Sequence, residues 1–160
     1  MKTKFKFIGI MIVLVFALVF SQYAAARDLI VVATESTQKA SQDWLGFLES
    51  KEIPVRLVKP DSFSSVREEL YIFILGGIDE SEEIKEIAKD ALTADEFKSL
   101  SSEGKMFYKP QAWNVGQKVI LILGPNQKAA KEARISAKEE WYGMLKDWFD
   151  IEDTSGFHIY

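Results

Sequence analysis

The chain has 160 residues, of which 48% are hydrophobic and 28% are charged, so it can build the core of one globular domain but is short for two. It contains no cysteine, which excludes disulfides, thiol catalysis and thiolate metal sites. Its one histidine, His158, would have to serve any Ser-His-Asp triad.

The N-terminal segment has the three parts of an export signal. Three lysines open the chain, an unbroken apolar run covers residues 7–20, and three alanines end the segment with an A-x-A site. The run is shorter than the ~20 apolar residues of a membrane span. We therefore predict a signal peptide at residues 1–26 and a single extracytoplasmic domain at residues 27–160. An uncleaved membrane anchor over residues 5–26 and a buried core helix are the alternatives.

Removing this segment makes the chain distinctly acidic. Residues 27–160 hold 17 basic and 24 acidic side chains, a formal charge of −7. Nucleic-acid binding domains carry a basic stripe or patch, which this composition lacks. Anionic membrane surfaces are poor partners for the same reason. We therefore expect no nucleic-acid partner, and membrane contact only through an uncleaved N-terminal segment.

Short apolar runs predict the strands. Four of them are rich in β-branched residues, and three of those four are continuous rather than alternating, as in strands that are covered on both faces. A fifth run precedes a turn containing Pro110 and Gly116, which favours an antiparallel hairpin with the run that follows. The five runs are residues 29–32, 55–58, 71–75, 106–109 and 119–123.

Apolar residues at helical spacing separate these runs. They predict a helix over residues 37–50, another after Asp79, and a long last helix over residues 130–148. Thr93 and Glu96 have the spacing of a capping box that begins a further short helix. The alternation predicts a three-layer α/β domain with a mainly parallel sheet of four to five strands, one antiparallel edge hairpin, and helices on both faces.

The carboxyl ends of parallel strands are the usual place for a ligand in such a fold. Gly76-Gly77 ends one strand before a helix, so backbone amides there are able to hold an anion; the alternative is a tight turn with acidic residues at the start of the helix. A calcium site among those acidic residues is less favoured, because they lack EF-hand spacing. The predicted rim comprises Thr34, Glu35, Ser36, Gly76, Gly77, Asp79, Gly124, Pro125 and Asn126.

Exposed tryptophan side chains suit sugars or protein partners. Trp44, Trp141 and Trp148 fall on apolar helix stripes, which favours core positions for them. Trp113 lies in the predicted hairpin turn, where periodicity does not require burial. We therefore expect Trp113, together with the rim around Gly76, to contact a ligand.

Two segments resemble a known group of surface proteins. A strand, Gly-Gly and an acidic helix occupy residues 71–92, and the sequence Ala-Trp-Asn-Val-Gly-Gln-Lys leads into the strand that ends at Gly124, before an alanine-rich helix. These features resemble exported archaeal envelope domains of the S-layer-associated or cell-wall-binding kind. The resemblance implies an α/β fold at the cell surface and no catalytic residues.

The resulting hypothesis is a non-enzymatic extracytoplasmic domain that binds a protein or glycan of the cell envelope, with no cofactor and no metal. One alternative is a small enzyme acting on an envelope saccharide, with Asp79 or Glu35 as its acid or base. Another is a structural surface subunit.

Overall fold

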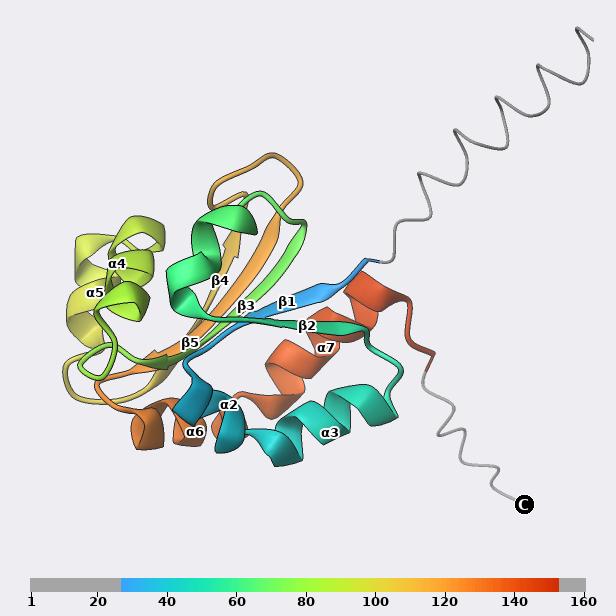
Figure 1. Ribbon diagram of the computed structural model, residues 1–160, viewed down its shortest axis with the longest axis horizontal. Helices are drawn as coiled ribbons and strands as arrows, with labels where there is room; N and C mark the ends of the chain where they lie inside the picture. The colour runs from blue at the N-terminus through green and yellow to red at the C-terminus, as the bar shows by residue number, and fades with distance from the viewer. Residues whose placement is uncertain (1–26, 153–160) are drawn as a thin grey trace, which may run out of the picture.

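Five strands form one mixed sheet at the centre of the computed structural model, which describes residues 27–152 (Figure 1). The strand order is β2-β1-β3-β5-β4, parallel throughout except for the antiparallel edge strand β4. This confirms the predicted fold class. The strands are β1 (Leu29–Val32), β2 (Val55–Val58), β3 (Tyr71–Gly77), β4 (Lys105–Pro110) and β5 (Lys118–Gly124).

Helices cover both faces of this sheet. One face packs against α3, α6 and α7, and the short α2 leads into α3. The other face packs against the 3-10 helix η1, α4 and α5 (Figure 1). The bounds are α2 (Glu35–Lys39), α3 (Gln42–Ser50), η1 (Pro60–Ser65), α4 (Glu82–Ala91), α5 (Ala94–Ser99), α6 (Gln127–Ser136) and α7 (Lys138–Phe149).

The continuous apolar runs follow from burial on both sides. Side chains alternate along a strand, so Val31 and Phe73 enter the core beneath α3 and α7, whereas Ile30 and Ile72 enter the core beneath η1 and α4. All four are at most 1% exposed. The central strands β1, β3 and β5, covered by helices on both sides, are therefore apolar at nearly every position, whereas the edge strands β2 and β4 also contain charged residues.

The predicted rim and the hairpin turn lie at opposite ends of the sheet. The register pairs Gly77 with Gly124, so β3 and β5 end together, and α4 and α6 begin beyond them. The hairpin turn over residues 111–117 lies at the opposite end, where β4 stops and β5 starts. A seven-residue strand spans about 20 Å, so these two ends are well separated.

Two predicted helices are interrupted. The prediction of one helix over residues 37–50 was wrong, because α2 begins earlier, at an N-cap formed by Thr34, and α3 restarts after Ser41. The long last helix likewise breaks at Ala137, between α6 and α7. There the indole N–H of Trp141 donates to the Arg134 carbonyl at 2.8 Å. In a continuous helix that carbonyl would accept the N–H four residues onward, so the indole replaces a helical hydrogen bond.

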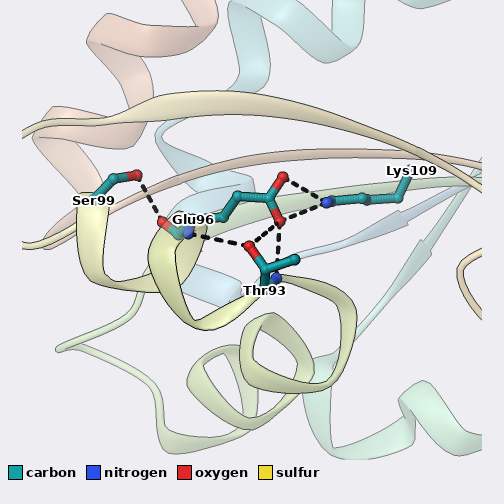
Figure 2. Close-up of polar contacts among 4 residues, drawn as sticks. All are labelled: Thr93, Glu96, Ser99 and Lys109. Atoms are coloured by element: carbon teal, nitrogen blue, oxygen red, sulfur yellow. Dashed lines mark hydrogen bonds and ion pairs between the residues drawn. The ribbon is translucent and has the colours of Figure 1, made fainter.

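The predicted capping box joins α5 to the edge strand. The Thr93 hydroxyl accepts from the Glu96 amide, the Glu96 carboxylate accepts from the Thr93 amide, and Lys109 of β4 donates to the same carboxylate at 2.6 Å (Figure 2). The bond from Lys109, and then that from the Thr93 backbone, hold the pKa of Glu96 below its ordinary value. The ionised Glu96 carboxylate therefore stabilises the fold at neutral pH, and this stabilisation is lost as the pH falls through the lowered pKa of Glu96.

The predicted signal peptide, residues 1–26, and His158 lie outside the described residues. Within residues 27–152, no helix combines the length and the apolar character that a membrane crossing requires.

Candidate functional site

The predicted rim is assembled at the carboxyl ends of β1, β3 and β5, but its loops pack directly on one another. The Ile78 amide donates to the Gly124 carbonyl at 2.9 Å, and the Asp79 amide donates to the Pro125 carbonyl at 3.1 Å. A Cβ on Gly77 would lie 2.6 Å from the Asn126 Cα. The two glycine-containing turns therefore allow a close contact between the β3 and β5 loops.

The helix that follows Gly76-Gly77, α4, begins with Glu82 and Glu83, and the Ser81 hydroxyl at its N-cap accepts from the Ile84 amide, as in the alternative of a turn followed by acidic residues. The matching helix end beyond β5 is also occupied by groups of the chain itself. The Gln127 amide, in the first turn of α6, donates to the Glu80 carboxylate at 2.6 Å. The Asn126 side chain accepts from the Ala129 amide at 3.0 Å, and the Gln127 side chain donates to the Ser36 carbonyl at 3.2 Å. These donors are consequently engaged within the molecule.

The acidic residues of the rim are solvated. Glu35 has a side chain that is 63% exposed, and it lies 3.1 Å from Lys39 and 3.8 Å from Lys59. Asp79 is also exposed. Among residues 27–152, no three His, Cys, Asp or Glu side chains gather as a metal site would need.

Trp113 lies at the opposite end of the sheet from the rim and belongs to a small cluster of its own. Its indole N–H donates to Asp90 at 2.7 Å, and its ring packs edge-on against Phe63 with 5.0 Å between ring centroids. The Arg67 guanidinium lies over the same ring at 5.6 Å. The structure therefore does not bring Trp113 together with Gly76, and the indole is already engaged.

A different site is formed where α3 faces the break between α6 and α7. A pocket of about 280 Å³ opens there, and most of its wall is aromatic or aliphatic. Its two tryptophans, Trp44 and Trp141, were predicted to lie in the core, and its arginine, Arg134, was not among the predicted site residues. The lining residues are Asp43, Trp44, Phe47, Arg134, Ile135, Lys138 and Trp141.

Arg134 is the unusual member of this pocket. It is only 2% exposed, and its Nη1 has no hydrogen-bond partner. The nearest anionic group is the Asp43 carboxylate, 3.6 Å from Nη2, which is longer than a hydrogen bond. Burial lowers the pKa of Arg134, and Asp43 opposes part of that shift. The guanidinium is thus a buried cation with weak compensation.

Trp44 supplies a second unpartnered donor. Its indole N–H is buried without a partner, while its ring lies 5.2 Å from the Arg134 guanidinium. By contrast, the indole N–H of Trp141 has the Arg134 carbonyl. Within the described residues, Trp44 Nε1 and Arg134 Nη1 are the buried side-chain nitrogens without a partner. Both belong to residues that line the same pocket.

The comparisons with known proteins give no relative. No protein-family model, curated protein or solved structure matches this chain. The choice between the rim and the pocket therefore rests on their chemistry. Several donors of the rim are used internally, whereas two residues that line the pocket each carry a buried N–H group without an acceptor.

Proposed function

We propose that this chain is a binding domain that acts outside the cytoplasm, and that its pocket at the break between α6 and α7 receives an anionic group of an envelope protein or glycan. The observation that carries this proposal is the pair of buried, unpartnered donors at Trp44 Nε1 and Arg134 Nη1. A ligand that presents acceptor oxygens would satisfy both.

Buried N–H groups without hydrogen-bond partners support a binding role, because leaving them unpaired is unfavourable for folding. Each buried polar group without a partner costs about 1–3 kcal/mol, and a charged group costs more. Such groups are rare in folded proteins and often mark a functional site. Here Arg134 and Lys138 outnumber Asp43 among the charges of the pocket, so the local charge is positive in a chain whose net charge is −4.

The distribution of carboxylates favours binding over hydrolysis. The pocket contains one carboxylate, Asp43, whose side chain is 68% exposed. A glycosidase uses two, one of them in an apolar setting. Glu35 and Asp79, the residues of the enzyme hypothesis, lie in the exposed rim instead. The export signal predicted at residues 1–26 supports the compartment.

The test is recovery and binding of the full chain. When it is expressed with residues 1–26 in a host with a cell envelope, we expect protein in the exported fraction that sediments with isolated envelope material. The Arg134→Met variant should be exported equally but sediment much less. Protein confined to the cytosol would contradict the compartment, and equal sedimentation of both forms would contradict the pocket. Detergent-resistant assemblies that form without envelope material would favour a structural surface subunit.

A further inference from the structure

We infer that the group received by the pocket is a carboxylate carried on a single sugar ring, as in a uronate unit of an acidic glycan. This inference rests on the proposed function and names the ligand for the same site.

The number and kind of free donors indicate a carboxylate. Arg134 and Trp44, which both line the pocket, each carry a buried N–H group with no partner: the guanidinium Nη1 and the indole Nε1. A carboxylate has two acceptor oxygens, and guanidinium groups match its planar geometry. Phosphate carries more oxygens and up to two negative charges, which two N–H groups satisfy less completely. The Asp43 carboxylate beside them would also repel a dianion more strongly.

The Asp43 carboxylate lies close to the position that a ligand carboxylate would occupy beside Arg134. Its Oδ1 is 3.6 Å from Arg134 Nη2, and its side chain is mostly in solvent. Although Arg134 is buried, the Asp43 carboxylate stays hydrated, and the 3.6 Å contact is too long for a hydrogen bond. A ligand carboxylate can therefore displace it at small cost, and Asp43 competes with any bound anion. Removing its charge should strengthen the binding of a carboxylate.

The walls and mouth of the pocket suit a sugar ring. The Trp44 and Trp141 rings are nearly perpendicular, with centroids 6.0 Å apart, and Phe47 lies edge-on to Trp141 at 6.1 Å. Trp44 and Trp141 are 5% and 2% exposed, so a pyranose would contact only the uncovered parts of these rings, and a volume of about 280 Å³ holds about one ring. The exposed charges of Asp43 and Lys138 at the mouth can bond hydroxyl groups. A peptide carboxyl terminus is the rival occupant.

Calorimetric titration of the purified protein tests the inference with four probes. The probes are methyl glucuronoside, methyl glucoside, glucose 6-phosphate and N-acetylleucine. We expect the glucuronoside to bind about tenfold or more tightly than the glucoside, which lacks the charged hydrogen bond, and more tightly than the phosphate and N-acetylleucine, which match the donors or the walls less well. Stronger binding of N-acetylleucine or of the phosphate would overturn the inference, as would undetectable glucuronoside binding at about 10 mM, near the weak limit of a specific site.

Variants locate the binding. Arg134→Met should abolish it, Trp44→Phe should weaken it, and Asp43→Asn should strengthen it several-fold. Arg67→Met is the matched control, because Arg67 also lies over a tryptophan ring, Trp113, but on the other face of the sheet. If Arg134→Met fails to fold, the affinities of Asp43→Asn and Trp44→Phe still show whether the ligand binds in this pocket. An unchanged affinity in both of these variants would overturn the assignment to this pocket.

A second experiment tests the uronate separately from the proposed binding function. Envelope glycan is tested before and after chemical reduction of its carboxyl groups. Loss of binding on reduction supports the uronate. Retained binding that still depends on Arg134 would overturn the uronate and leave the proposed function standing.

Discussion

Replacing Gly77 by alanine is expected to lower the free energy of unfolding by about 1–3 kcal/mol or more. The added Cβ would lie 2.6 Å from the Asn126 Cα and 2.7 Å from its carbonyl carbon, both backbone atoms at the start of α6. Relief of this clash requires the β3 and β5 loops to separate. That separation would weaken the hydrogen bond from Ile78 to Gly124 and the cap that Glu80 provides to α6.

The matched control is Gly143→Ala in α7. A Cβ there meets nothing within 4 Å, so alanine should raise stability by about 0.5–1 kcal/mol through its higher helix propensity. Urea denaturation followed by tryptophan fluorescence measures both variants against the wild-type protein. A Gly77→Ala variant as stable as the wild type would show that the rim loops are free to move apart, and an open rim would again be a candidate ligand site.

The second large effect is expected at Arg134. Arg134→Met should keep the fold and raise the free energy of unfolding by about 1–2 kcal/mol, because it replaces a poorly compensated buried cation with an apolar side chain of similar length. Nη1 has no partner, and the Asp43 carboxylate left behind is 68% exposed and remains hydrated. The same variant should lose ligand binding, which would identify Arg134 as a residue kept for binding rather than for stability.

Denaturation curves for Arg134→Met, Arg134→Lys and Arg67→Met measure this effect. Arg67 is 46% exposed and pairs with Asp90, so its replacement should change stability by at most about 1 kcal/mol. Lysine at position 134 keeps a buried charge and should not stabilise. A loss of more than about 2 kcal/mol in Arg134→Met would show that the guanidinium holds α3 against α6, and the argument from unfavourable burial would be wrong.

The fold was predictable because its determinants are local in the sequence. Runs such as residues 119–123 are apolar at every position, which requires a cover on both faces, and Gly77 and Gly124 mark where the strands end. The helix breaks were less predictable. At the break near Ala137 the Trp141 indole donates to the Arg134 carbonyl, and apolar spacing does not report such a bond.

The site was harder to predict because it depends on contacts between distant segments. Nothing local shows that the Glu80 carboxylate caps α6, although this contact uses the first-turn amide of Gln127 at the predicted rim. One signal for the pocket was available. Arg134 lies four residues after Ala130 and seven before Trp141, so a charged residue occupies the apolar stripe of the last helical segment.

The most direct test of the pocket is the indole N–H resonance of Trp44 during titration with methyl glucuronoside. In the free protein this N–H has no acceptor, so a bound carboxylate should move its proton resonance downfield, and Trp44→Phe assigns the peak. The Trp113 resonance, already bonded to Asp90, should not move. A Trp44 resonance that stays in place at saturating ligand, or one that shifts equally in Arg134→Met, would contradict binding at this site.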